Sequence, residues 1–412
     1  MKIYRRNQRS VLSMAMNLTQ KLFAAHLAEP AKLVPGQEIK VTVDQTLTHD
    51  INAVMAYLAF EALDLDRVRT KLSVSYIDHN LLQIDNKTPD DHIYLQSIAQ
   101  KYGLVLSKAG NGICHALQCS RFGKPGTLLL GGDSHTPSCG ALGMLAIGVG
   151  GMDIAVALAG FPYVMKMPKV VKVNLKGRLR PGTAAKDIIL EMLRRTTVKG
   201  GVGKVYEYVG EGVETLSIPE RLTIANMGAE MGATTSVFPA DGQVRAFLKA
   251  QGREQDYTEW LPDAGCGYDE EIQLDLDALE PLVACPHMPD NVMKVADVPK
   301  IPVQQVFIGS CTNGSYSDFK KVALVLKEHK INPDVSLVLG ISSRQIYLRL
   351  LQDGVIADLV DSGARIPEFA CGPCCGIGIA PSSKGISVRT SNRNFKGRSS
   401  TADASLYLVS PE

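Results

Sequence analysis

The alternation of short β-rich runs with helical stretches is the feature that most constrains the fold of this chain. Runs rich in β-branched and apolar residues occur at 72–77 and 127–130, among helix-period patterns at 52–63, 90–102 and 151–160. This order is typical of βα units, whose strands pair in parallel and are covered by helices. The sequence therefore predicts an α/β protein with parallel sheets.

Breaks in this pattern predict three α/β/α domains. A strand with a turn at Gly177 occupies 168–181, and a Pro-rich region lies between 281 and 302. Residues 1–15 are basic and lack the apolar stretch of a signal peptide, so we expect a disordered extension upstream of a natural start near Met16. The predicted divisions are this extension over 1–15 and α/β/α domains over 16–175, 176–297 and 298–412. Further helices are predicted at 17–27, 184–195, 218–227, 316–328, 342–353 and 354–362, and a further strand at 303–308.

Charge and hydropathy argue against nucleic acid and membranes as partners. The chain carries 44 Lys and Arg against 42 Asp and Glu, and it has no basic stripe. Its longest apolar stretch, 141–163, is interrupted by glycines, a proline and Asp153, so it does not form a membrane-spanning helix. Without an export signal we expect a reducing, cytoplasmic compartment, in which the nine cysteines form no disulfides. Cys119, Cys266 and Cys285 are interpreted as small apolar residues.

Three other cysteines lie in two short motifs that can share one metal centre. Cys311 lies in IGSCTNG (308–314), between a predicted strand and a predicted helix, where converging backbone N–H groups stabilise a thiolate. Cys371 and Cys374 form a C-x2-C pair in ACGPC. Four thiolates close a structural zinc site or an electron-transfer cluster, whereas three leave one iron of a cubane free to act as a Lewis acid. A redox dithiol, and a zinc site of three cysteines and one histidine with Cys375 as the alternative fourth ligand, stay open on these residues alone.

Histidines and acidic residues occur close together at several polar motifs. Carboxylates beside imidazoles fix their tautomers and raise their basicity, and such pairs can deliver a proton to a departing hydroxyl group. The segment SNRNFKGR (391–398) adds two arginines, whose guanidinium groups bind carboxylates in bidentate fashion, so the implied ligand is a small polycarboxylate. The histidines are His49, His79, His115 and His135, and their acidic neighbours are Asp50, Asp78 and Asp133.

At these motifs the chain resembles the aconitase family of iron-sulfur hydro-lyases. The segments GGDSHTPSCGALG, NMGAEMGATTSVFP, IGSCTNG, ACGPC and SNRNFKGR occur in the family's order, and the resemblance covers nearly all of the chain after Met16. It is closest to the N-terminal three α/β/α domains of the shorter bacterial aconitate hydratases. The large subunits of 3-isopropylmalate dehydratase and homoaconitase share much of the same pattern.

The resemblance implies a [4Fe-4S] cofactor whose fourth iron binds the hydroxyl and carboxylate of the substrate. Its implied ligands are Cys311, Cys371 and Cys374. Asn392 matches a residue that supports the cluster environment.

The resemblance also implies roles for polar residues around the cluster. Asp78 and His79 match the pair that protonates the departing hydroxyl group. The imidazole–carboxylate pairs of the family match His115 with Asp133 and His135 with Glu230. The implied substrate-binding residues are His49, Ser134, Asn226, Arg393 and Arg398.

The chain departs from the aconitase pattern at a few positions. Aconitases usually have glutamine before the acidic residue of the first substrate loop. This chain has His49 before Asp50, as is more usual in 3-isopropylmalate dehydratases. Ser138 replaces a frequent asparagine, and Cys375 replaces an apolar residue. The chain also ends before the mobile swivel domain, which supplies the catalytic serine base in the family. We therefore expect it to be inactive alone and to need a separate small swivel-domain subunit.

Three functions are carried forward from the sequence. The first is aconitate hydratase, which interconverts citrate and isocitrate through cis-aconitate. The alternative is the large subunit of 3-isopropylmalate dehydratase or homoaconitase. The hypothesis from a different class is a catalytically silent cluster protein or RNA-binding protein.

Overall fold

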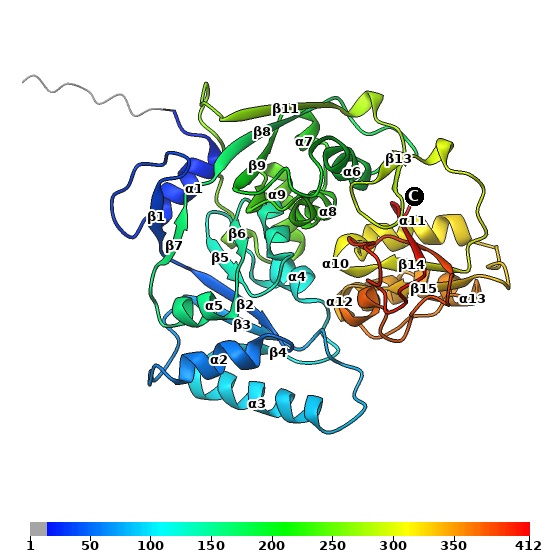
Figure 1. The fold of residues 1–412 in the computed structure, drawn as a ribbon, viewed down its shortest axis with the longest axis horizontal. Coiled ribbons are helices and arrows are strands. Elements are labelled where there is room, and N and C mark those ends of the chain that lie inside the picture. Colours follow the sequence, from blue (N-terminus) through cyan, green and yellow to red (C-terminus); the bar gives the residue numbers. More distant parts are fainter. Residues whose placement is uncertain (1–14) are drawn as a thin grey trace, which may run out of the picture.

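The computed structural model describes residues 15–412, so the extension expected over 1–15 lies outside this range except for its last residue. The described chain begins with helix α1 (Leu18–His26), which confirms the helix predicted at 17–27 (Figure 1). Asn17 and Gln20 form a capping box, in which Oδ1 of Asn17 accepts the Gln20 N–H at 2.9 Å. The buried carboxylate of Glu207 accepts the first two amides of the helix.

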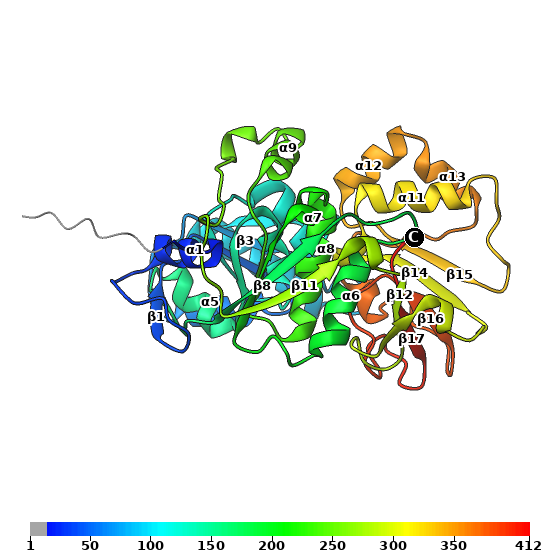
Figure 2. The same ribbon diagram turned by 90° about the horizontal axis from the view of Figure 1, so that it is seen from above.

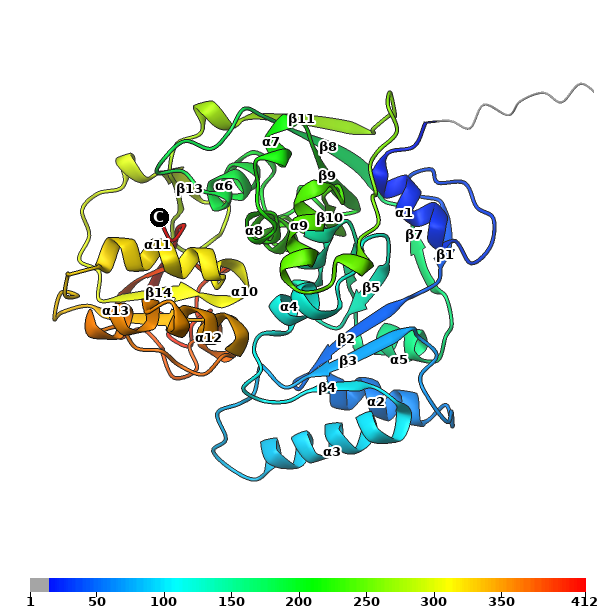
Figure 3. The same cartoon turned by 180° about the vertical axis from the view of Figure 1, so that it is seen from behind.

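The first sheet has five parallel strands in the order β4-β3-β2-β5-β6. Most of its residues are buried, as expected for a parallel sheet covered on both faces. In the view of Figure 1, α2 and α3 lie below this sheet and α4 lies above it; Figure 3 shows α1 beside the small antiparallel ribbon of β1 and β7. The elements are β1 (Glu38–Val41), β2 (Gln45–His49), α2 (Ala53–Glu61), β3 (Leu72–Tyr76), α3 (Lys87–Tyr102), β4 (Val105–Ser107), α4 (Cys114–Leu117), β5 (Leu128–Gly131), β6 (Leu145–Gly148), α5 (Gly151–Leu158) and β7 (Tyr163–Lys166).

The second sheet has four parallel strands in the order β10-β9-β8-β11. Strand β8 ends just before Gly177, whose φ of 68° lies in the left-handed region that glycine tolerates, so the turn predicted at this position is confirmed. The elements are β8 (Lys169–Lys176), α6 (Ala185–Thr196), β9 (Lys204–Val209), α7 (Glu211–Glu214), α8 (Ile218–Gly228), β10 (Thr235–Val237), α9 (Gly242–Ala250) and β11 (Glu270–Asp275).

The third sheet has six strands in the order β13-β12-β17-β16-β14-β15. Strands β17, β16, β14 and β15 are parallel, whereas β12 and β13 are antiparallel additions at one edge. Figure 2 shows α11, α12 and α13 together over one face. The elements are β12 (Leu282–Ala284), β13 (Val292–Lys294), β14 (Gln305–Gly309), α10 (Ser310–Asn313), α11 (Tyr316–Leu326), β15 (Ser336–Gly340), α12 (Arg344–Gln352), α13 (Val355–Asp361), β16 (Ile386–Arg389) and β17 (Ser405–Leu408).

The α/β class is confirmed, and each helix and strand predicted from the sequence is present close to its predicted position. The three-domain division stays a prediction, and sheet membership differs from its boundaries at two places. Strand β8 pairs with β9 and β11 of the second sheet, while β12 and β13 pair into the third. The first two units also share a core, because Val170, Val205 and Val237 pack in the same apolar cluster as the first sheet.

Between residues 15 and 412, no helix combines the length and the apolar character needed to cross a membrane.

Candidate active site

Loops at the carboxyl ends of the first sheet bring most of the predicted polar residues together. His49 is the last residue of β2, Asp78 and His79 follow β3, and Asp133 follows β5. Parallel neighbours end at the same edge of a sheet, and ligands of open α/β sheets bind at that edge. His115 joins them from the short helix α4.

The loop that carries Asp78 and His79 is held by a buried carboxylate. Oδ1 of Asp50 accepts the N–H groups of His79 at 2.9 Å and Asp78 at 3.2 Å, and Oδ2 accepts that of Asn80 at 2.7 Å. Oδ1 of Asp78 lies 2.8 Å from Nδ1 of His79, and Oδ2 accepts the N–H of Cys114 at 2.7 Å. The His79 ring is therefore oriented by its neighbour, which is itself fixed by the backbone.

Asp133 is a shared partner of four imidazole groups. Oδ1 lies 2.8 Å from Nε2 of His115 and 3.5 Å from Nδ1 of His135, and it accepts the His135 N–H at 2.7 Å. Oδ2 lies 3.4 Å from Nε2 of both His49 and His79. Burial works to raise the pKa of Asp133, but its contacts with His115, His135 and His79 hold that pKa well below its usual range. Asp133 is thus an anion around which the imidazoles are arranged.

The imidazoles of His49 and His79 differ in protonation. Burial lowers the pKa of His49 to about 4, and the charge of His79 adds to this shift. Burial also acts to lower the pKa of His79, but Asp78, Asp133 and negative charge at the Cys371 sulfur raise it well above the ordinary histidine value. Neighbouring groups whose pKa values are driven apart divide the roles of acid and base. These opposite shifts favour the proton on His79 rather than on His49.

A second polar chain links the three units across the site. Nε2 of His135 lies 2.9 Å from Oε1 of Glu230, and Arg393 Nε donates to both Glu230 oxygens at 2.8 and 3.0 Å. Nη2 of Arg393 donates to Oγ of Ser134 at 2.8 Å. Arg393 is 22% exposed, so part of its guanidinium group is available to a ligand.

The three predicted thiols lie beside these polar residues. Cys311 lies in α10, directly after β14, and Cys371 and Cys374 lie at the 3-10 turn Gly372–Cys375. Nδ2 of Asn226 donates to the Cys311 sulfur at 3.3 Å, and Nδ2 of Asn392 lies 3.6 Å from the same atom.

A guanidinium group and the proton-donating loop adjoin the other two thiols. Nη2 of Arg398 lies 3.8 Å from the sulfur of Cys374. The N–H of Cys371 donates to the backbone oxygen of Asp78 at 2.7 Å, which ties the thiol loop to the loop of His79. Side-chain N–H groups directed at sulfur are suited to thiolates that carry negative charge.

The thiolate predicted at Cys311 stays a prediction, and the donors that lie near its sulfur are side-chain amides. Burial raises the pKa of the Cys311 thiol well above its usual value, and the nearby Cys371 and Cys374 sulfurs raise it further. The donor found at its sulfur is the Asn226 side chain rather than converging backbone amides. A positive metal centre is what would ionise such a buried thiol, because metal binding displaces the proton.

The donor set fits an iron-sulfur centre better than a single ion. Within residues 15–412, the three sulfurs do not form a group whose members all lie within 4.8 Å of one another. Sulfurs bound at about 2.3 Å to one tetrahedral zinc ion lie closer together than that. Buried polar atoms in the site also lack a partner in the described chain, namely Nδ1 of His49, Nδ1 of His115 and Nε of Arg398. The site therefore has unsatisfied groups that a cofactor or substrate can meet.

The remaining cysteines differ in burial. All nine cysteines of the chain fall within residues 15–412, and none of them is disulfide-bonded. Cys119 packs in an apolar core, as predicted, with its sulfur 3.3 Å from that of Cys139. Cys266 and Cys285 are only partly buried and are not core residues. Both lie outside the helices and strands. The residues around a cysteine do not by themselves show whether it is buried in a core or lies near the surface.

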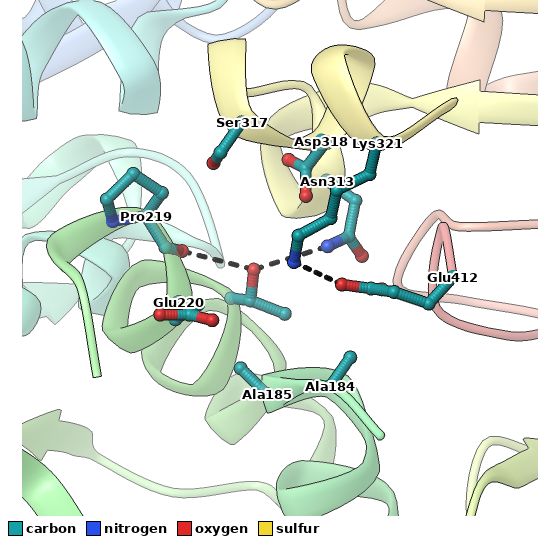
Figure 4. Close-up of a pocket in the computed structure, with 10 residues that line it drawn as sticks. Ala184, Ala185, Pro219, Glu220, Asn313, Ser317, Asp318, Lys321 and Glu412 are labelled. Carbon is teal, nitrogen blue, oxygen red and sulfur yellow. Dashed lines mark hydrogen bonds and ion pairs between the residues drawn. The ribbon is translucent and has the colours of Figure 1, made fainter. Parts of the chain in front are cut away.

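A small polar cavity lies between α8 and α11, apart from these catalytic candidates. Figure 4 shows Glu220 from α8 on one side and Asn313, Asp318 and Lys321 on the other, with Lys321 ion-paired to Glu412. It marks the junction between the second and third units.

Comparison with known proteins decides the family. The model of the aconitase family (aconitate hydratase) matches residues 20–300 and 296–412. The chain belongs to the aconitase family. It is accordingly a hydro-lyase, and the resemblance stated from the sequence motifs is confirmed.

Similar aconitase-family proteins carry names of 3-isopropylmalate dehydratase large subunits. The large subunit 1 of Thermotoga maritima is 36% identical over 401 residues, covering 97% of this chain and 96% of that protein. The large subunit 2 of Archaeoglobus fulgidus is 36% identical over 378 residues, 91% of each chain. Among solved structures, the holo form of Thermococcus kodakaraensis aconitase X has a TM-score of 0.50 at 13% identity, covering 86% of this chain and 84% of that one, which shows a shared fold.

One buried residue near the site, Lys186, was absent from the predicted set. Asp50 was named from the sequence as the acidic neighbour of His49, which was the signal for it, but without the loop-holding contacts found here. Lys186, a buried residue discussed below, had no such signal, because it lies in a predicted helix without any motif. The roles of the predicted residues in this aconitase-family site stay predictions.

Proposed function

We propose that this chain is the large subunit of a hydro-lyase that removes water from, and adds it to, 3-isopropylmalate or a close hydroxy-polycarboxylate. Two observations favour this substrate over citrate, which the sequence motifs had put first. The similar proteins are named 3-isopropylmalate dehydratase large subunits. In addition, Asp50 is preceded by His49, whereas aconitases usually have glutamine before this acidic residue.

The cofactor in this proposal is a [4Fe-4S] cluster held by Cys311, Cys371 and Cys374. Three thiols with side-chain N–H donors at two of them support this assignment. When bound, such a cluster supplies a Lewis-acidic iron to an alcohol oxygen, because only three of its irons have protein ligands.

Protonation of the departing hydroxide is assigned to His79. Hydroxide is a poor leaving group, and a positioned acid contributes about 10²- to 10⁴-fold to such a step. The observation that carries the proposal is the 2.7 Å hydrogen bond from the Cys371 N–H to the Asp78 backbone oxygen. It fixes the proton-bearing pair of Asp78 and His79 against a loop that carries cluster ligands.

Arg393 and Arg398 are assigned to the carboxylates of the substrate. Arg393 donates to Ser134 and Glu230 and is still partly exposed. Nε of Arg398 is buried without a partner in the described chain. A substrate carboxylate would complete the hydrogen bonding of these guanidinium groups.

The proton on carbon must be removed by a base from a separate small subunit in this proposal. Its support is that the similar proteins are named large subunits. The chain alone is therefore expected to bind a cluster and show no full turnover.

The test begins with anaerobic purification or reconstitution and measurement of iron and sulfide. Turnover is then measured on 3-isopropylmalate, citrate and homocitrate, with and without a small swivel-domain subunit. We expect iron and sulfide in about equal amounts and activity only with the small subunit, highest on 3-isopropylmalate. Preference for citrate would restore the aconitate hydratase assignment, and full turnover by the isolated chain would contradict the two-subunit proposal. An iron-loaded chain inactive with every subunit would support the silent-cluster class, and RNA binding in a gel-shift titration would support the RNA-binding class.

A further inference from the structure

Lys186 is a fully buried lysine at the junction between the second and third units. It lies in α6 and has 0% exposure. Figure 4 shows the preceding Ala184 and Ala185 facing the segment of Asn313 across the junction. Burying an ammonium group is unfavourable unless it is hydrogen-bonded and its charge is balanced.

The hydrogen bonds of Lys186 all go to uncharged oxygens of the third unit. Its Nζ donates to the backbone oxygens of Thr390 at 2.5 Å and Ser391 at 2.7 Å, and to Oδ1 of Asn313 at 3.4 Å. Three acceptors require the three protons of an ammonium group, because a neutral amine has only two. In the described chain no carboxylate forms an ion pair with it.

A second buried cation in the same region is likewise without a carboxylate. Arg389 is 0% exposed, and its guanidinium donates to Gln305, Ser387 and the backbone oxygen of Ile379. Its Nη1 has no partner in the described chain. By contrast, the fully buried Arg221 of the second unit pairs with Asp241 at 2.6 Å. In the described chain, neither cation therefore has the direct carboxylate partner that Arg221 has.

The acceptors of Lys186 lead directly to the thiols. Asn313 is two residues beyond Cys311, and Ser391 precedes Asn392. The Asn392 side chain places Nδ2 3.6 Å from the Cys311 sulfur and Oδ1 3.9 Å from the Cys374 sulfur. Burial lowers the pKa of Lys186 to about 7, while negative charge at the Cys374 sulfur, Asp318, Asp187 and the Cys311 sulfur favours its charged form.

We propose that Lys186 and Arg389 are positioning residues that balance the negative charge of the thiolate centre. Three thiolates around a [4Fe-4S]²⁺ core leave a net negative charge, and these two cations lie behind the thiol-bearing loops with no carboxylate of residues 15–412 hydrogen-bonded to either. Lys186 in addition holds the loop after Cys311 against the loop before Asn392. The inference rests on the cluster assignment of the proposed function.

The positive charges of Lys186 and Arg389 should affect both the reduction potential of the cluster and how firmly the chain retains it. Removing a nearby positive charge makes an added electron less favourable, so the midpoint potential should become more negative. Loss of an outer partner of a metal site weakens binding by about 10- to 100-fold. Iron release to a chelator should accelerate by a comparable factor.

The experiment compares wild type with Lys186→Met, Lys186→Gln, Lys186→Arg and Arg389→Gln after anaerobic reconstitution. Lys204→Met is the matched control, because Lys204 pairs with Glu270 at the surface of the second sheet. Redox titration followed by electron paramagnetic resonance gives the potential, and absorbance gives the rate of cluster loss. We expect a negative shift and faster loss in Lys186→Met, Lys186→Gln and Arg389→Gln, and wild-type potentials in Lys186→Arg and Lys204→Met.

Each outcome bears on a different part of the proposal. Lys186→Gln keeps N–H donors and lacks the charge, so a wild-type potential in this variant together with one in Arg389→Gln would overturn the inference. If Lys186→Met does not fold, those two variants carry the test. A wild-type chain that takes up no iron and sulfide would overturn the proposed cofactor and this inference together, whereas an iron-loaded wild type with unshifted variants would overturn the inference alone.

Discussion

His49 and His79 are stacked, with ring centroids 3.8 Å apart and ring planes at 19° to each other. Nε2 of each ring lies 3.4 Å from the same oxygen of Asp133. Two imidazolium ions in this arrangement would repel each other, so one proton is favoured on the pair. The additional contact of His79 with Asp78, at 2.8 Å, favours that proton on His79.

His79→Ala should remove the acid while leaving the cluster ligands in place. We expect kcat to fall by about 10²- to 10⁴-fold, because hydroxide would leave without a positioned proton donor. Iron and sulfide content, measured on the same anaerobic preparation, should stay at the wild-type level. Unchanged turnover would remove this role from His79.

Asp50→Ala should release the backbone of the Asp78–His79 loop. The carboxylate accepts three N–H groups, and the loss of charge-assisted hydrogen bonds is expected to lower the free energy of unfolding by about 2 kcal/mol or more. kcat should fall with little change in KM, since His79 is the proposed proton donor to the leaving group. Denaturant unfolding and steady-state kinetics check the two effects, and Asp85→Ala in an exposed loop is the control. Wild-type stability in Asp50→Ala would show that the loop does not need this anchor.

Arg393→Lys should weaken carboxylate binding. Lysine keeps the positive charge but has a single nitrogen. It cannot donate to Glu230 and Ser134 from separate nitrogens, as the planar guanidinium group of Arg393 does, and also bind a substrate carboxylate. An increase of KM by about tenfold or more is expected, equivalent to about 1.4 kcal/mol. Arg344→Lys, outside the described site, serves as the control. A KM unchanged in Arg393→Lys would place substrate recognition elsewhere.

Cys374→Ser and Cys375→Ser separate a proposed ligand from its neighbour. The Cys374 sulfur is close to Arg398 and Asn392, whereas Cys375 is a half-buried residue that is not needed for a three-thiol centre. Anaerobic reconstitution should leave Cys374→Ser depleted of iron and Cys375→Ser loaded. The reverse result would reassign the third ligand.

The pair of Asp44 and His26 predicts a stability loss in acid. Burial works to raise the pKa of Asp44, but hydrogen bonds from His26, Lys71 and the Leu128 N–H lower it below its usual range. A carboxyl group with a depressed folded-state pKa stabilises the fold above its unfolded pKa of about 4, and this contribution is lost as the pH falls further. The urea midpoint of wild type should exceed that of Asp44→Asn at about pH 5, and the gap should narrow toward about pH 3. If the difference between the two urea midpoints did not change with pH, the ionised Asp44 carboxylate would not be its source.

Prediction from sequence succeeded where the relevant signal was local. The turn at Gly177 and the helix of α8 follow from residue types within a few positions, and both are present. Prediction was incomplete at the sheet boundaries, because β8 could be assigned to either neighbouring unit until its partners β9 and β11 were known. It did not anticipate the donor to the Cys311 sulfur, since the contact with Asn226 joins segments 85 residues apart.

Local sequence was sufficient to determine the α/β order and the motifs that carry the thiols, imidazoles and guanidinium groups, because each depends on neighbouring residues. The tertiary structure decided which of these groups share a partner. It placed His49 and His79 on one carboxylate, and it buried Lys186 against a loop 204 residues farther along the chain. Burial and charge balance arise from contacts between distant segments, so no pattern within a single segment determines them.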